Sequence, residues 1–340
     1  MRGDGENGSS PLHSRRSLLL ATSFVFSAVA ALAQTVPGFR AARPEGRVRD
    51  LKIVILSTML ADQGIGEWGF AALVEADGHR ILFDTGARPD TVLENAVALG
   101  IDLTNVKEVI LTHNHSDHTG GLLTLRREYS KKNPEALSRV HVARGIFWTR
   151  VEAGTTEANP MIAIKAAYEA TGGTFIEHAE PAELFSGAWL TGPVPRVNPE
   201  RNWSVTGRVK TPEGFVEDNV PEDQSLVFDT SLGLVLLSGC GHAGIVNTIQ
   251  HARNSLRLAP LYAAIGGFHL FGLDDEKLTW TIGKLQEFGL VHFLGAHCTG
   301  IEPVYRLRYH STLDRPRAVV GAVGASFRLG KGIDPLRLAR

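Results

Sequence analysis

The stretch LTHNHSDHTGG at residues 111–121 places three histidines and one aspartate within six residues, directly after a hydrophobic run. That run, VKEVILT (106–112), has the composition of a buried strand, and GLLTLRREYSKK (121–132) is predicted to be a helix. The ionisable side chains therefore lie in a connection between a strand and a helix, where rigid scaffolds usually display functional groups.

These four side chains are predicted to be metal ligands. Residues two apart in an extended loop project the same way, so His113 and His115 can bind one ion. Asp117 and His118 then turn toward a neighbouring position. Imidazole and carboxylate ligands suit zinc, or iron or manganese where more oxygens contribute. The alternative is a solvated turn with chance histidines, which three histidines so close together after a buried strand disfavour.

The sequence of strand, small-residue turn and histidine returns three times in the second half of the chain. LGLVLLSGCGHAG contains His242, LYAAIGGFHL contains His269, and LVHFLGAHCTG contains His297. Together with the turn at 113–118, the chain therefore has four turns that follow a strand and carry histidine, and a functional interpretation has to explain all four.

The remaining pattern is that of a layered α/β protein. LKIVILST (51–58) is predicted to be a strand, and GFAALVEADGHRILFDTG (69–86) to be a hairpin around Asp-Gly. Helices are predicted at 90–100 and 274–289. From about 134 to 222 the pattern loosens into short strands and Pro/Gly-rich stretches, which indicates an elaborated region that covers a site rather than a separate domain.

The string H-x-H-x-D-H, followed by Thr119-Gly120-Gly121, resembles the signature of the metallo-β-lactamase fold superfamily. ILFDTG matches the acidic residue of that family at a strand end, here Asp84. SGCGHAGIVNT, GGFHL and AHCTG are similar to the branch of archaeal dihydropterin ribofuranosyl-aminobenzene phosphate synthases. The resemblance runs from about Lys52 to Phe327. It implies an α/β fold, the αβ/βα four-layer sandwich of two mixed β-sheets with outer helices and a site at one sheet edge.

The resemblance also implies a centre of two zinc ions per chain, with iron or manganese as alternatives. Two such ions about 3.5–4 Å apart can bridge a hydroxide and neutralise an anionic transition state. The implied ligands are His113, His115 and His242 for the first ion, and Asp117, His118 and His297 for the second, with Asp84 behind them to orient the loop through hydrogen bonds.

The chain departs from the family pattern at one position. The family usually has a bridging aspartate after a strand between the last two histidine motifs, and His269 stands in that place here. We expect His269 to be a ligand or a donor to a substrate oxygen. Asp274 and Asp275 open a predicted helix and are expected to be caps. His13 lies in the N-terminal segment that is predicted to be a signal peptide. The residues expected to be structural are His79, His141, His178, His251, His292 and His310, together with Trp148, Trp189 and Trp203, one of which could line the mouth of a pocket.

Three functions follow from this site. The first is a dinuclear hydrolase that attacks an ester, lactone or phosphoester, with Asp117 and His118 as catalytic residues and Asp117 holding the metal-bound hydroxide. The second, implied by the branch, is a metal-dependent transferase that joins a dihydropterin to a phosphoribosyl-type aromatic amine and releases diphosphate. The third is a metal-binding protein without turnover, which intact ligand motifs disfavour.

Composition limits the partners. Of the 340 residues 43% are hydrophobic and 21% charged, and the net charge is -1, so neither a nucleic-acid-binding surface nor a membrane-surface patch is indicated. A small-molecule substrate, anionic in character, is expected. The two cysteines, Cys240 and Cys298, permit a disulfide, but each lies one or two residues from a predicted ligand, so metal contact and packing stay open.

The N-terminal segment has the features of an export signal. Arg15-Arg16 precedes the uncharged stretch SLLLATSFVFSAVAALA, which ends in an A-x-A site before Gln34. The paired arginines resemble a twin-arginine signal, which exports folded proteins. We expect a signal peptide at 1–33, a metallo-β-lactamase-like metal-dependent hydrolase domain at 34–340, a periplasmic location and no stable membrane association after cleavage. The alternative is an uncleaved anchor helix.

Overall fold

The computed structural model describes residues 46–152, 157–203 and 206–338. The predicted signal peptide at 1–33 lies outside the described residues. Among the helices of the described part, none combines the length and the hydropathy that crossing a bilayer would need.

The first sheet has eight strands. They are β1 (Leu51–Ser57), β3 (Ala71–Ala76), β4 (His79–Phe83), β5 (Glu108–Ile110), β6 (Arg139–Ala143), β8 (Thr174–His178), β19 (Ser326–Arg328) and β20 (Gly332–Asp334). Their order across the sheet is β20-β19-β1-β3-β4-β5-β6-β8. The four strands β4, β5, β6 and β8 run parallel to one another, and the other neighbouring pairs are antiparallel.

The second sheet has seven strands. They are β9 (Ala182–Phe185), β10 (Ala188–Leu190), β13 (Ser225–Thr230), β14 (Gly233–Ser238), β15 (Leu261–Gly266), β16 (His292–Gly295) and β17 (Ala318–Val320). Their order is β17-β16-β15-β14-β13-β10-β9, with β14 to β17 parallel. Two small sheets complete the set: β7 (Arg150–Val151) with β11 (Arg208–Thr211) and β12 (Gly214–Glu217), and β2 (Leu60–Ala61) with β18 (Ala322–Val323).

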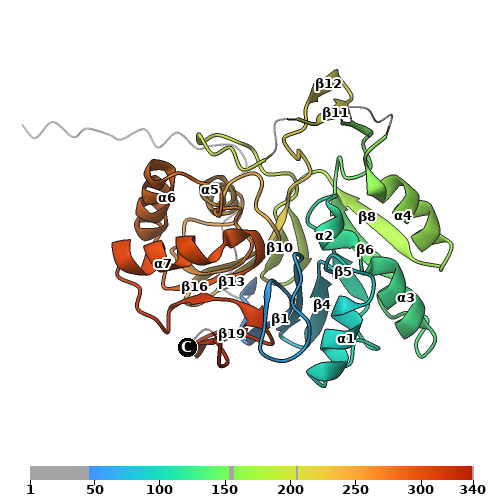
Figure 1. Cartoon of the computed structure of the whole chain (residues 1–340), viewed down its shortest axis with the longest axis horizontal. Coiled ribbons are helices and arrows are strands. Elements are labelled where there is room, and N and C mark those ends of the chain that lie inside the picture. The colour runs from blue at the N-terminus through green and yellow to red at the C-terminus, as the bar shows by residue number, and fades with distance from the viewer. Residues whose placement is uncertain (1–45, 153–156, 204–205, 339–340) are drawn as a thin grey trace, which may run out of the picture. The chain divides into compact units, whose positions relative to one another are not determined.

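Helices cover the outer face of each sheet, on opposite sides of the strands in Figure 1. The first sheet is covered by α1 (Thr91–Ala98), α3 (Leu122–Ser130) and α4 (Pro160–Glu169). The second is covered by α5 (Ile245–Ser255), α6 (Asp275–Glu287) and α7 (Ile301–His310). A short helix, α2 (Ser116–Thr119), and a 3-10 turn, η2 (His297–Thr299), lie in the loops.

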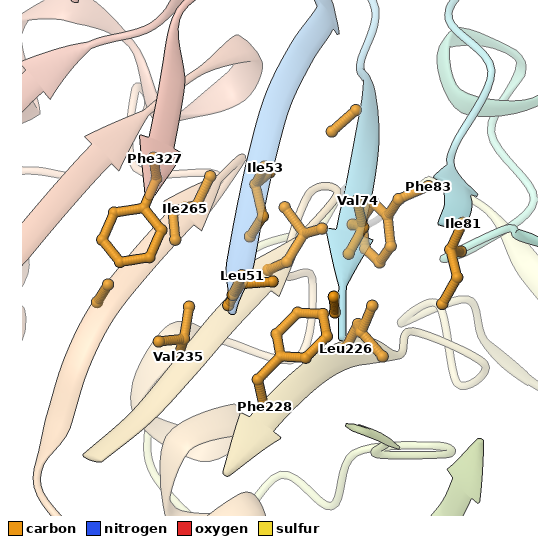
Figure 2. Close-up of a cluster of buried hydrophobic side chains, with 14 of the residues drawn as sticks. Leu51, Ile53, Val74, Ile81, Phe83, Leu226, Phe228, Val235, Ile265 and Phe327 are labelled. Carbon is orange, nitrogen blue, oxygen red and sulfur yellow. The ribbon is translucent and has the colours of Figure 1, made fainter. Parts of the chain in front are cut away.

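The inner faces of the two sheets enclose the main core, in which β-branched and aromatic side chains interlock (Figure 2). Ile53 and Val74 of the first sheet and Phe228 and Ile265 of the second are fully buried there. Burial of each such side chain stabilises the folded state by about 1.5–3 kcal/mol. The sum of these contributions holds the two sheets face to face. The predicted four-layer sandwich is thereby confirmed.

Most predicted elements match observed ones. The strand at 51–58 is β1, and the hairpin turns at Asp77-Gly78, both with positive φ. Asp274 caps α6 by accepting from the Lys277 amide, as expected. The interpretation of 134–222 as a cover was wrong in part, because β6 and β8 extend the first sheet and β9 and β10 extend the second.

Candidate metal centre

The predicted ligands lie in loops at the carboxyl ends of parallel strands from both sheets. Such strand ends meet at one edge of a sheet, which is where open α/β folds place their sites. The loops follow β4 (Asp84), β5 (His113 to His118), β14 (Cys240 and His242), β15 (His269) and β16 (His297 and Cys298). Packing of the two sheets therefore assembles one cluster from segments far apart in sequence.

The structure brings together both triads that the resemblance implied. Ligand atoms lie within 4.8 Å of one another in each triad, one formed by His113, His115 and His242, the other by Asp117, His118 and His297. The triads adjoin, since the His113 and His118 ring centroids are 4.3 Å apart. The six predicted site histidines and the two predicted carboxylates, Asp84 and Asp117, thus lie in this cluster or directly against it.

Asp84 fixes the orientation of the loop from behind. Its carboxylate accepts hydrogen bonds from the Thr112 amide (2.8 Å), the Thr112 hydroxyl (2.9 Å) and His118 Nδ1 (2.7 Å). Thr112 Oγ1 lies 2.9 Å from His113 Nδ1. These bonds use the Nδ1 atoms of His113 and His118 and leave both Nε2 atoms facing the cluster.

The chemistry of the donor set fits a metal. His242 Nδ1 donates to the Asn202 carbonyl at 2.6 Å, so its Nε2 also faces the cluster. Buried polar atoms nearly always have a partner in native proteins. Several buried ring nitrogens have none within the described residues: His113 Nε2, His242 Nε2 and His269 Nδ1. A bound cation would satisfy these atoms.

Burial sets the protonation of the cluster. It lowers the pKa of His113 and of His242 well below the ordinary range, and neighbouring histidines lower both further. Burial also lowers the pKa of His115, to about 4. For His118 the lowering by burial is outweighed by Asp84 and Asp117, which raise the pKa to about 9. His113, His115 and His242 are therefore neutral imidazoles at neutral pH, the form in which histidine binds metals, whereas His118 carries a proton that a metal ion would have to displace.

His269 lies beside the first triad rather than away from it. Its ring centroid is 4.7 Å from that of His242, and its ring belongs to a potential ligand group with His242 and Cys240. Its backbone has φ of 48°, and Asp84 (54°) and His297 (46°) share this left-handed conformation. Such strain in non-glycine residues concentrates at functional sites.

A pocket of about 680 Å³ opens beside the cluster, lined among others by Trp68, His115, Asp117 and Arg150. Trp68 is 48% exposed and its ring lies 4.8 Å from His297. It meets Phe271, which is 52% exposed, edge to face at 5.5 Å. An aromatic pair is thus exposed next to the candidate ligands.

Sequence reasoning missed several residues of the site. Trp68 and Phe271 have no sequence signal, since an isolated aromatic residue is usually part of the core. Thr112 did have a sequence signal, because it directly precedes the histidine motif. The Asn202 carbonyl could not be foreseen, since any residue can supply a backbone acceptor.

Comparisons with known proteins agree with this geometry. A family model described as the metallo-beta-lactamase superfamily matches residues 69–157. The 7,8-dihydropterin-6-methyl-4-(beta-D-ribofuranosyl)-aminobenzene-5'-phosphate synthase of Methanocaldococcus jannaschii is 32% identical over 271 residues, covering 76% of this chain and 90% of that protein. An uncharacterized protein of the same organism is 29% identical over 251 residues, covering 70% and 86%. Among solved structures, Tm1679, described as a metal-dependent hydrolase of the beta-lactamase superfamily, matches with a TM-score of 0.63 at 25% identity, covering 85% of this chain and 100% of its own.

Proposed function

Because this chain belongs to the metallo-beta-lactamase superfamily, in the family of the dihydropterin ribofuranosyl-aminobenzene phosphate synthase, we propose that it is a metal-dependent synthase. It would join a dihydropterin to an aromatic amine that carries a ribosyl phosphate. The observation that carries the proposal is the 32% identity to that synthase over 90% of its length. The ligand cluster supports it, because the residues that such chemistry needs are assembled in one place.

The hydrolase hypothesis drawn from the sequence was wrong. The curated relative of stated activity is a synthase, so the transferase that was placed second describes the chain better. The predicted export signal would argue against a transferase, because such phosphorylated intermediates are expected in the cytoplasm, but that signal lies outside the described residues. The ligand motif alone could not separate the two reactions, since both use the same metal-binding residues.

In the proposed reaction the nitrogen of the aromatic amine forms a bond to the methylene carbon of a dihydropterin methyl diphosphate and gives up one proton to solvent. The bond from that carbon to a diphosphate oxygen breaks, and diphosphate leaves. Divalent metal ions, one held by each triad, would stabilise the charge that develops on the leaving group. The pocket volume of about 680 Å³ falls in the range of small-molecule sites.

The chain's own cations contribute little to binding an anion here. Arg150 is the one lysine or arginine among the described residues that line the pocket. Its Nε donates to Asp218 at 2.8 Å, and it also forms an ion pair with Glu222. Because these carboxylates already neutralise the guanidinium, we propose that anionic substrates depend on the metals. We propose two ions, zinc before iron or manganese, since imidazole nitrogens dominate the ligand set.

Trp68 and Phe271 suit a planar substrate ring. Aromatic side chains bind flat rings by stacking and edge contacts worth about 0.5–1.5 kcal/mol beyond burial. Because Trp68 lies beside His297 and Phe271 beside His269, the pair would place a pterin or aminobenzene ring next to the metal ligands. Trp68→Ala should raise KM for the ring-bearing substrate about tenfold and change kcat less. Tyr309→Ala, which removes an aromatic residue that is 75% exposed on α7, is the matched control.

The test of the synthase is a coupled assay on the purified, metal-loaded full chain. The substrates are a dihydropterin methyl diphosphate and a ribofuranosyl-aminobenzene phosphate. We expect the joined product and diphosphate in equal amounts, with both lost after chelation. Diphosphate release with water as the acceptor, and no joined product, would contradict the proposal.

A further inference from the structure

The two cysteines of the chain lie inside the histidine cluster. Cys240 follows β14 two residues before His242, and Cys298 follows His297 directly. Both side chains are buried, with 2% and 1% exposed, and both are free thiols. Free cysteines commonly act as small apolar core residues, so their contacts decide their role here.

The contacts of Cys240 are with ligands rather than with the core. Its Sγ lies 3.1 Å from His118 Nε2, the ring nitrogen that Asp84 orients toward the cluster. It belongs to three potential ligand groups, each with atoms within 4.8 Å. In the first group its partners are His113 and His118, in the second His242 and His269, and in the third His297 and Cys298. Cys240 is therefore the residue that the groups around both triads share.

The charge of the cluster calls for a further anion. Asp117 is the one carboxylate in the described potential ligand groups, and the other members are histidines and cysteines. Asp84 lies behind the ligands, engaged by Thr112 and His118. Two divalent ions in a buried site with a single carboxylate would leave positive charge poorly compensated, which is costly at low dielectric. A thiolate would supply a second negative ligand.

We propose that the Cys240 thiolate is a metal ligand, placed between the two triads. Metal binding would displace the thiol proton and form a metal–sulfur bond. Cys298 Sγ lies 3.2 Å from Cys240 Sγ and accepts from the His269 amide at 3.3 Å, so it lies beside the ligand without binding the metal itself. His269 is then freed for substrate contact. The assignment rests on the metal dependence of the proposed function and not on the identity of its reaction.

Sulfur ligation can be read directly from the metal. In the zinc-loaded full chain, X-ray absorption should show a sulfur neighbour at about 2.3 Å, beside nitrogen and oxygen at shorter distance. The cobalt-substituted protein should show a thiolate-to-metal charge-transfer band in the near ultraviolet. C298S should keep both signals and C240S should lose both. Since the chain has two cysteines, the pair of variants assigns the sulfur unambiguously.

Cys240→Asp is the conservative rescue, because it restores a negative ligand without sulfur. It should recover the metal stoichiometry that C240S lowers. If C240S fails to fold, wild type and C298S still identify the sulfur ligand, because a sulfur signal that persists in C298S can come only from Cys240. A full metal complement with no sulfur signal in wild type, or a signal lost in C298S instead, would overturn the assignment and leave the synthase standing. Absence of any bound metal would instead remove the proposed function as well.

Discussion

Three histidines of the cluster share one orientation. His113, His118 and His242 each direct Nδ1 to an oxygen and leave Nε2 toward the centre. Hydrogen bonds of this kind fix the tautomer of a ligand and hold its ring in place before any ion arrives. The orientation of the ligand rings is therefore set by residues that would not touch a metal, chiefly Asp84 and Thr112.

Asp84→Asn tests this orientation. Asparagine tolerates the left-handed φ of 54°, so the loop should keep its conformation while His118 loses its anionic partner. We expect metal affinity to fall about 10- to 100-fold, measured by competition with a chelator, with an unchanged circular dichroism spectrum. Asp77→Asn is the matched control, since that residue also has positive φ (46°) but lies in the exposed β3–β4 turn. Equal affinity in wild type and Asp84→Asn would refute the role.

His115→Ala should abolish synthase turnover and lower the metal content while leaving the protein folded. The side chain contributes to the first triad and lines the pocket. Metal analysis and product formation on the same sample check the prediction. His310→Ala, at the exposed end of α7, should change neither. Full turnover at unchanged metal stoichiometry in His115→Ala would remove the first triad from the centre.

At the scale of elements, the glycine after β14 permits the close approach of the two sheets. A Cβ at Gly239 would lie 2.3 Å from Thr112 Oγ1 and 2.4 Å from Asp84 Oδ2. Gly239→Ala should therefore destabilise the fold by about 1–3 kcal/mol in urea unfolding and weaken metal binding. Gly283→Ala, inside α6 with nothing within 4 Å, should stabilise by up to about 1 kcal/mol. Equal effects of the two substitutions would contradict the packing described.

The strands and hairpin at the start of the chain could be predicted because their apolar runs end in clear turns. The helix α4 and the strands β9 and β10 could not, since they alternate with Pro/Gly-rich segments and gain their place from tertiary contacts. The histidines could be predicted from their spacing. Trp68 could not, because an isolated aromatic residue gives no sign of a site until the fold brings it beside a histidine. For Cys240 the sequence left a disulfide, metal contact and packing open, and the fold places its sulfur 3.1 Å from His118 Nε2.

For the whole molecule, the metal motifs predicted the superfamily but not the reaction. The ligands determine how an ion is held, whereas the substrate is chosen by the walls of the pocket. Those walls come from the region of the sequence that was hardest to interpret, including β7 and the residues around Asp218. A hydrolase was predicted wrongly because the histidine motifs report on the metal ligands and not on the pocket walls that select the substrate.

The export signal remains a prediction. Replacement of Arg15 and Arg16 by lysine should leave precursor in the cytoplasm, because a twin-arginine signal depends on that pair. Fractionation and immunoblotting measure the outcome. Replacement of Arg47 and Arg49, which lie beyond the predicted cleavage site, is the control. Undisturbed periplasmic delivery of the Arg15/Arg16 variant would show that the pair is incidental, and a wild-type protein found in the cytoplasm would reject export altogether.

Metal should also stabilise the fold as a whole. At a free ion concentration 100 times Kd, binding to the native state alone adds about 2.7 kcal/mol to the free energy of unfolding. Because the ligands come from loops of both sheets, the gain should appear in global unfolding and not only locally. Urea titrations with and without chelator measure it. Identical midpoints would mean that the native chain does not bind the ion at that concentration.

The assembly of ligands from both sheets has a consequence for the life of the protein in its cell. Proteases act mainly on opened molecules, so a chain whose sheets are joined by an ion should be degraded more slowly than one without it. Scarcity of the metal would then reduce the number of molecules as well as the fraction that is active. We expect the half-life of this protein to follow nutritional metal supply.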